Sequence, residues 1–144
     1  MAQVPWQSMN RKFSLIFAIG LLVLLSGCYS HPPVHTEISV IMSGNSFQPA
    51  SWRVPAGALV TLHLTNQDPE AHEWVILFRQ AAEPYNSRDD GSIFWSCSVP
   101  AGKSETFQFK APAAAGNYEI VSRDALADGM AGNLTVVRLD EIQK

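Results

Sequence analysis

The sequence has few cysteines, few charged residues and no long hydrophobic run, and these shortages exclude several classes of protein. Its 144 residues include two cysteines, which excludes a disulfide-rich scaffold. Ten Lys and Arg stand against thirteen Asp and Glu, a net charge of −3, so no electrostatic footprint for nucleic acid is present. The sequence also lacks a phosphate-binding loop, a dinucleotide fingerprint and a nucleophile elbow, so neither an enzyme nor any catalytic residue is predicted.

The longest apolar run lies near the start of the chain. Phe13–Leu25 follows a short basic region and is too short for a comfortable membrane span, which is typical of a secretion signal. Leu25–Cys28 (LSGC) then resembles the bacterial lipobox, in which the cysteine is acylated and becomes the first mature residue. The alternative is an uncleaved N-terminal anchor with an incidental cysteine. The sequence therefore predicts a signal peptide over residues 1–27, lipid on Cys28 and a periplasmic or extracytoplasmic, membrane-anchored protein.

The predicted mature chain has room for one domain. Cleavage before Cys28 leaves 117 residues with a net charge of −5, because two basic residues belong to the signal. Residues 28–35 are rich in proline and are expected to form an extended tether, followed by a domain over residues 36–140. If Cys28 carries lipid, Cys97 has no disulfide partner, and a free cysteine is most often a small buried hydrophobe.

The domain is predicted to be all-β. Apolar and polar side chains alternate in several short segments, and no helical period lasts three turns. Turn residues interrupt these segments at Gly44-Asn45 and Pro55–Gly57. About seven to eight strands at this spacing predict an antiparallel β-sandwich. The side chains expected to face its core are Val60, Leu62, Leu64, Phe107, Phe109, Tyr118, Ile120, Leu134 and Val136.

The stretch from Arg79 to Ser98 is the least regular part of the chain. Its first half is polar and is predicted to be a surface loop. Its second half contains Phe94 and Trp95, which have two interpretations. They belong either to a strand or cover that packs on the core, or to an exposed aromatic docking surface for a partner.

Two parts of the sequence closely resemble the bacterial cupredoxins, the family of blue copper proteins. Asn45–Leu77 (NSFQPASWRVPAGALVTLHLTNQDPEAHEWVIL) has the Asn-x-Phe-x-Pro opening, the Val-Pro-Ala-Gly turn, an Asn at a strand end and a histidine before the next strand. The later segments APAAAGNYEIVS and GMAGNLTVV resemble the second half of the family, which contains the ligand loop. The resemblance covers nearly all of Thr36–Arg138 and implies a cupredoxin-like Greek-key β-sandwich or barrel.

The resemblance also implies a copper site, which this sequence does not complete. A blue copper centre takes two imidazoles and one thiolate, with a weak axial thioether. The first imidazole of the family falls on His72, and its ligand loop, Cys-x2-His-x4-Met in the shortest form, falls on Ser122, Ala125 and Met130. His72 and Met130 thus remain as a degenerate or weak metal site, and Ser122 and Ala125 are the lost-ligand positions. No cofactor is expected besides the lipid, with copper as the alternative.

Carboxylates near these positions offer another kind of site. Glu73 follows His72, and Asp124 and Asp128 lie in the ligand loop, so together they would hold a harder divalent ion loosely. Strand alternation, however, turns Glu73 away from the side that His72 faces. Solvation of a surface loop is the simpler role for the two aspartates.

Two functions therefore stay open. The first is a cupredoxin-like lipoprotein without blue copper, a non-catalytic binding, accessory or structural subunit of a respiratory or photosynthetic membrane complex. Its partners are the membrane, through the lipid anchor, and a membrane protein. The second is a copper-binding electron-transfer or metal-handling protein with an altered site. Metal content and visible absorption of the purified protein distinguish the two.

Overall fold

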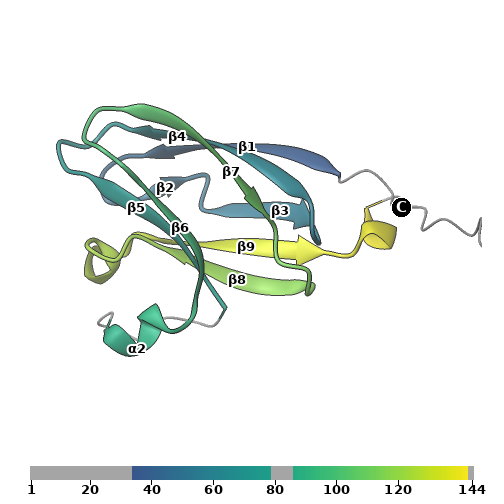
Figure 1. Cartoon of the computed structure of the whole chain (residues 1–144). Coiled ribbons are helices and arrows are strands. Elements are labelled where there is room, and N and C mark those ends of the chain that lie inside the picture. Colours follow the sequence, from purple (N-terminus) through teal and green to yellow (C-terminus); the bar gives the residue numbers. More distant parts are fainter. Residues whose placement is uncertain (1–33, 79–85, 143–144) are drawn as a thin grey trace, which may run out of the picture. The chain divides into compact units, whose positions relative to one another are not determined.

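The computed structural model describes residues 34–78 and 86–142, which form two β-sheets packed face to face (Figure 1). Contacts divide the chain into Met1–Pro32 and Pro33–Lys144, and all described residues lie in the second unit. The predicted signal and Cys28 lie outside them. Among the described residues, no helix has the length and apolar character needed to cross a membrane.

Nine strands make up the two sheets. The first sheet has the order β2 (Phe47–Gln48), β1 (His35–Met42), β4 (Leu59–Asn66) and β7 (Ser104–Lys110). The second has the order β3 (Ser51–Pro55), β9 (Ala131–Val137), β8 (Gly116–Val121), β5 (His72–Leu77) and β6 (Ile93–Val99). The helical turns are α2 (Ser87–Asp90), η1 (Leu126–Asp128) and η2 (Leu139–Glu141).

The all-β prediction is confirmed, with two differences. The sheets are mixed rather than antiparallel, because β1 pairs with β4 and β3 with β9 in parallel. The chain also crosses from the first sheet to the second between β2 and β3, and neither of these short strands was predicted. Crossing between sheets places β3 beside the last strand, at the edge of the second sheet.

The predicted core is confirmed. Eight of the nine side chains expected inside are buried, and Phe107 is partly buried against the same cluster. Trp52 and Trp74 add an unpredicted aromatic contact, with ring centroids 4.5 Å apart. Phe94 and Trp95 are also partly buried against this core, and Trp95 stacks on Phe109 at 4.8 Å. The structure therefore packs this pair against the core and leaves both side chains partly exposed.

The second sheet is covered on both faces, which explains the unbroken apolar run of β5. Trp74 and Ile76 face the main core, whereas Val75 and Leu77 belong to a second cluster on the outer face. Leu126 of η1 packs into that outer cluster and is 4% exposed. This contact anchors the loop that joins β8 to β9 against the sheet.

Gly132 allows β9 to approach the Trp52 ring. A Cβ atom at this position would lie 2.8 Å from Trp52 Cζ3 and 2.9 Å from the Ala50 carbonyl oxygen. We expect Gly132→Ala to destabilise the fold by about 1–3 kcal/mol, because one of the two contacts is with rigid backbone. Urea unfolding measures the loss. Adding Trp52→Phe should recover part of it, since a smaller ring relieves only the side-chain contact. An unchanged unfolding midpoint in Gly132→Ala contradicts this account.

Candidate functional site

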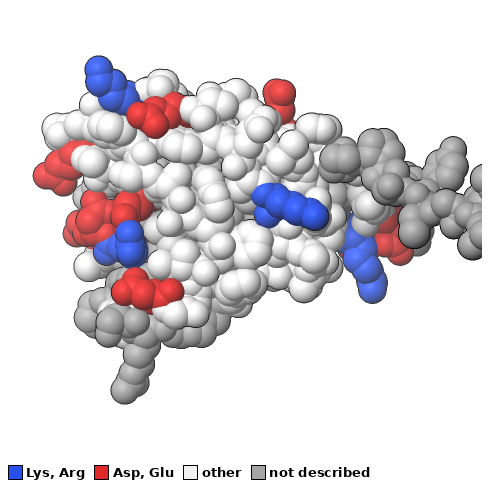
Figure 2. Space-filling model, in the orientation of Figure 1, with Lys and Arg blue, Asp and Glu red and all other residues white. Residues whose placement is uncertain are grey.

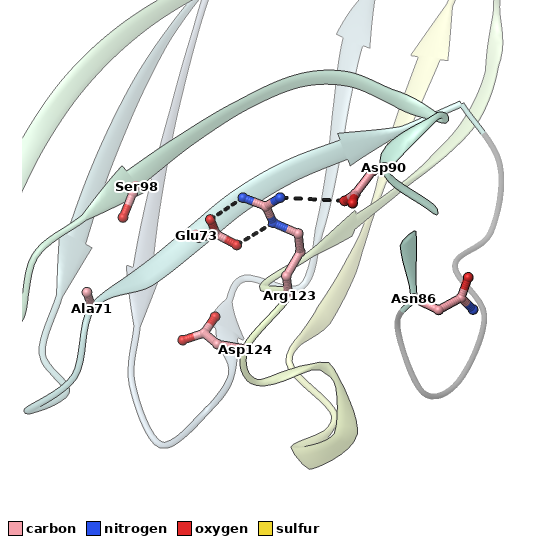
Figure 3. A pocket seen from close by; sticks show the side chains of 7 residues that line it. All are labelled: Ala71, Glu73, Asn86, Asp90, Ser98, Arg123 and Asp124. Carbon is pink, nitrogen blue, oxygen red and sulfur yellow. Dashed lines mark hydrogen bonds and ion pairs between the residues drawn. The ribbon is translucent and has the colours of Figure 1, made fainter. Parts of the chain in front are cut away.

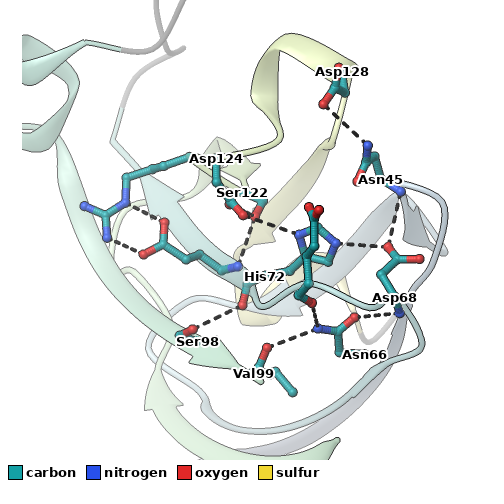
Figure 4. A network of polar contacts seen from close by, with 12 residues as sticks. Asn45, Asn66, Asp68, His72, Ser98, Val99, Ser122, Asp124 and Asp128 are labelled. Carbon is teal, nitrogen blue, oxygen red and sulfur yellow. Dashed lines mark hydrogen bonds and ion pairs between the residues drawn. The ribbon is translucent and has the colours of Figure 1, made fainter. Parts of the chain in front are cut away.

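The candidate site lies at the end of the sandwich where three connections meet (Figure 4). These are the β1–β2 turn, the β4–β5 loop and the loop between β8 and β9. His72 is the first residue of β5 and is fully buried. Ser122 directly follows β8 and is also fully buried. Ala125 and Met130, on either side of η1, are buried as well.

His72 lies between two carboxylates. Its Nε2 is 3.0 Å from Asp68 Oδ2, a hydrogen bond. Its Nδ1 is 3.7 Å from Asp124 Oδ2 and has no hydrogen-bond partner. The two carboxylates thus approach opposite nitrogens of the ring, so they cannot share one metal ion with it. A carboxylate on one nitrogen fixes the ring and leaves the other nitrogen directed at the site, as in many metal-binding histidines.

The β1–β2 turn positions Asp68. Gly44 and Asn45 both have positive φ angles, 58° and 53°, as a two-residue type I′ turn requires. Their backbone N–H groups donate to the Asp68 carboxylate at 2.8 and 3.3 Å. The hydrogen bond from the Gly44 N–H is the main cause that lowers the pKa of Asp68 below its ordinary value of 3.8. The Asn45 N–H and the His72 ring lower it further, and together these effects outweigh burial, which acts in the opposite direction. Asp68 is therefore ionised at neutral pH.

Asn66 fixes the conformation of the β4–β5 loop through side-chain hydrogen bonds. Its side chain is buried, and its Nδ2 donates to the carbonyl oxygens of Glu70 at 2.7 Å and Val99 at 3.1 Å. Its Oδ1 accepts from the Asp68 backbone N–H at 3.0 Å. These bonds fix the backbone on both sides of Asp68 and lead the chain into His72.

Ser122 is fully engaged in hydrogen bonds. Its Oγ accepts from the Glu73 backbone N–H at 3.0 Å and donates to Asp124 Oδ1 at 2.7 Å. The Ser122 N–H donates to the Met130 carbonyl at 3.2 Å, and the Met130 N–H donates to the Ala125 carbonyl at 3.1 Å. The structure thus brings all four positions suggested by the sequence to one end of the sandwich.

The two loop aspartates are exposed, as expected of solvated loop residues, and they also make specific contacts. Asp124 accepts the Ser122 hydroxyl and faces His72. Asp128 accepts from Asn45 Nδ2 at 3.4 Å. These contacts close the loop over the site. Asp128 and Asn45 are 83 residues apart, and His72 is also far from Asp124 along the chain, so local patterns could not predict these two contacts.

Glu73 points away from His72, as strand alternation predicts. It pairs with the Arg123 guanidinium through two hydrogen bonds, and Arg123 also lies 3.6 Å from Asp90 (Figure 3). These side chains and Asp124 line a shallow cleft of about 630 Å³ on the outer side of the second sheet. Asp124 therefore borders both this cleft and the buried histidine.

The residues present do not fit a blue copper centre. Among the residues that the structure describes, no three His, Cys, Asp or Glu side chains are arranged to hold a metal ion. Cys97 lies on β6 opposite Trp74, and burial, with smaller effects of Glu105 and Glu73, raises the pKa of its thiol to about 12. The metal-free thiol is therefore protonated at neutral pH, and it lies on a strand outside the loop between β8 and β9. The site offers one imidazole, one thioether and a hydroxyl that is already bonded.

Comparison with known proteins supports the fold. A family described as the cupredoxin-like domain matches residues 15–136. A reduced auracyanin from the photosynthetic bacterium Roseiflexus castenholzii is similar over 74% of this chain and 99% of its own, with 21% identity and a TM-score of 0.58. Auracyanin A, a "blue" copper protein from Chloroflexus aurantiacus, is similar over 72% and 99%, with 21% identity and a TM-score of 0.59.

A more distant neighbour is the metal-binding domain of a Cu(I)-exporting P-type ATPase from Streptococcus pneumoniae. It is 16% identical, with a TM-score of 0.50 over 74% of this chain and 97% of its own. No curated protein sequence matches the chain. At these identities the solved structures show the common fold and nothing finer.

Proposed function

Because the chain belongs to the cupredoxin-like domain family, we propose that it is an extracytoplasmic lipoprotein in which the type-1 copper ligands have been lost. Lipid on Cys28 tethers it to a membrane. It acts there as a non-catalytic binding or structural subunit of a respiratory or photosynthetic complex, and its partner is a membrane protein of that complex. The domain contributes a rigid β-sandwich whose former metal end is closed by side chains.

The observation that carries the proposal is the bonding of Ser122. In the family pattern this position supplies the copper thiolate, which dominates both affinity and electron transfer. Here a hydroxyl takes the place of the sulfur, and its proton is donated to Asp124 at 2.7 Å. A serine hydroxyl is a poor ligand for copper, and the Ala125 methyl group offers no donor atom at all. The polar network around His72 joins the loops through hydrogen bonds among their own residues.

We expect the wild-type protein to show no blue copper chemistry. Added Cu(II) should give no intense thiolate charge-transfer band, and any bound copper should be removed readily by a chelator, because no thiolate is available. Absorption and electron paramagnetic resonance spectra during a Cu(II) titration measure this. An auracyanin titrated in parallel is the positive control. An intensely coloured wild-type protein, or copper held tightly by Cys97, contradicts the proposal.

A second candidate function has one observation in its favour. His72 Nδ1 is buried without a hydrogen-bond partner, and the Asp68 carboxylate fixes the ring from the other side. This is the arrangement of a metal-binding histidine, and it favours a metal-handling or electron-transfer protein with an altered site. Copper content of the lipoprotein purified from native membranes distinguishes the two functions. A stoichiometric metal that remains after dialysis selects the second.

A further inference from the structure

An exposed apolar surface lies at the end of the domain where the described chain begins. We define this tether-end surface by Val34, Leu139 and Ile142, whose side chains are 40%, 47% and 49% exposed. Val34 and Ile142 border one cleft of about 490 Å³, together with Pro55 and Val137. Leu139 lies on the same 3₁₀ turn that leads to Ile142. β1 begins and the C-terminal turn ends at this end of the sandwich (Figure 1).

Apolar exposure is concentrated here. In the described part of the chain five large hydrophobic side chains are exposed, and three of them form the tether-end surface. Single exposed hydrophobic residues are normal, but two that line one cleft and a third on the adjoining turn indicate a surface that contacts another apolar surface.

The charges at the two ends of the domain differ. Arg53 borders the tether-end cleft. Lys110 on β7 pairs with Leu59 of β4, which in turn pairs with His35 at the start of β1. The nearby acids, Asp140 and Glu141, are both within ion-pair distance of Arg138. Acidic side chains gather instead around the opposite end, at the left of Figure 2. A negatively charged bilayer surface attracts the first end and repels the second.

We infer that the tether-end surface rests on the lipid bilayer that holds Cys28. This inference depends on the proposed lipid tether. Five residues lie between Cys28 and Val34, and the six steps of a fully extended chain span at most roughly 20 Å. The tether therefore keeps the apolar end close to the headgroups, where aliphatic side chains enter the interface and arginines contact phosphate. The end that carries His72 then faces away from the membrane, toward a partner.

Depth-dependent fluorescence quenching tests this orientation. The full-length protein, expressed with its signal, is labelled at Ile142→Cys or, as a matched control at the opposite end, at Glu70→Cys. It is reconstituted in mixed phosphatidylcholine–phosphatidylglycerol vesicles whose acyl chains carry doxyl groups near the headgroups. Unsubstituted protein sets the background, since the Cys97 thiol, with a pKa of about 12, reacts slowly. We expect loss of fluorescence at position 142 and none at position 70.

The possible outcomes distinguish a failure of the proposed membrane contact from a failure of the proposed lipid tether. Protein that floats with the vesicles but is quenched equally at both positions, or more at position 70, overturns the inference and leaves the tether intact. Protein that does not float, or that takes up label on Cys28, overturns the tether and the inference together. Label-to-label contact at position 142 without lipid quenching assigns the surface to a second copy and also overturns the inference.

A charge placed in the surface provides an independent check. Leu139→Glu in the Ile142→Cys background should reduce quenching at position 142, because a carboxylate is expelled from the interface, while flotation stays unchanged. Ile41→Glu is the matched control, since Ile41 is 39% exposed but lies on β1 outside the surface. Equal quenching in both variants and the parent contradicts a membrane contact at Leu139.

Discussion

Replacing Ser122 by Cys and Ala125 by His together should convert the protein into a coloured copper protein. The two changes restore the thiolate and the second imidazole beside His72 and Met130. Mutating residues that hydrogen-bond to the ligands of a metal site typically changes metal affinity by about 10–100-fold. Restoring two direct ligands should therefore raise Cu(II) affinity by more than about 100-fold. An intense visible band and the copper spectrum under electron paramagnetic resonance measure the gain.

Two features of the structure favour copper binding by the double variant. The Glu73 backbone N–H already donates to the side chain at position 122, at 3.0 Å, and the same N–H would favour a thiolate there. His72 Nε2 is hydrogen-bonded to the Asp68 carboxylate, so Nδ1 already faces the site without a hydrogen-bond partner. Each single substitution should achieve much less, because a trigonal plane needs all three donors.

Asp124 works against the restored site. Its carboxylate lies 2.7 Å from the Ser122 hydroxyl oxygen, and a negative charge so close raises the pKa of a thiol at that position. Adding Asp124→Asn to the double variant should therefore strengthen copper binding, by roughly tenfold for each pKa unit recovered. Arg123→Gln, which changes a neighbouring charge directed away from His72, is the control. A double variant that stays colourless at saturating copper shows that the loop does not place these side chains as the family pattern implies.

The fold could largely be predicted because alternation of apolar residues is a local signal. Val60, Leu62 and Leu64 repeat every second residue, and their burial follows directly. β3 was missed because it is five residues long and ends at a proline, which favours a turn interpretation. Its parallel pairing with β9 joins segments about 80 residues apart, and no local pattern encodes such a pairing.

The site could be predicted in part. The family motif located His72 and Met130, and Asp124 was recognised as a nearby carboxylate, but nothing in the sequence pointed to Asp68. Asp68 meets the Gly44 N–H, 24 residues earlier, only because two loops fold to the same end of the sandwich. One local signal was available: the asparagine of Asn66-x-Asp68 accepts the N–H two residues later, as asparagine commonly does in turns. That signal predicts a fixed loop and does not reveal what Asp68 binds.

Asp68→Ala should be strongly destabilising, by about 3 kcal/mol or more at neutral pH. The substitution leaves the Gly44 and Asn45 N–H groups without their acceptor, and it leaves a fully buried His72 with neither ring nitrogen bonded. Hydrogen bonds to a charged group contribute about 1.5–3 kcal/mol each, and a buried group left unpaired costs more. Urea unfolding at pH 7 measures the loss. Asp140→Ala is the control and should change stability by less than about 0.5 kcal/mol, because its side chain is 79% exposed.

The same variant should also change how stability depends on pH. The pKa of Asp68 is lowered in the folded protein, chiefly by the Gly44 N–H, from an ordinary value of 3.8. The ionised carboxylate therefore contributes its full stabilisation above about pH 4, and the contribution disappears as pH falls through the lowered pKa. The free-energy difference between wild type and Asp68→Ala should thus shrink as the pH is lowered from 5 to 3. Asp68→Asn should lose less at pH 7, because its amide oxygen still accepts one N–H, and its stability should follow the flatter pH curve of Asp68→Ala. A difference that stays the same at pH 3 assigns the loss to packing rather than to the charge of Asp68.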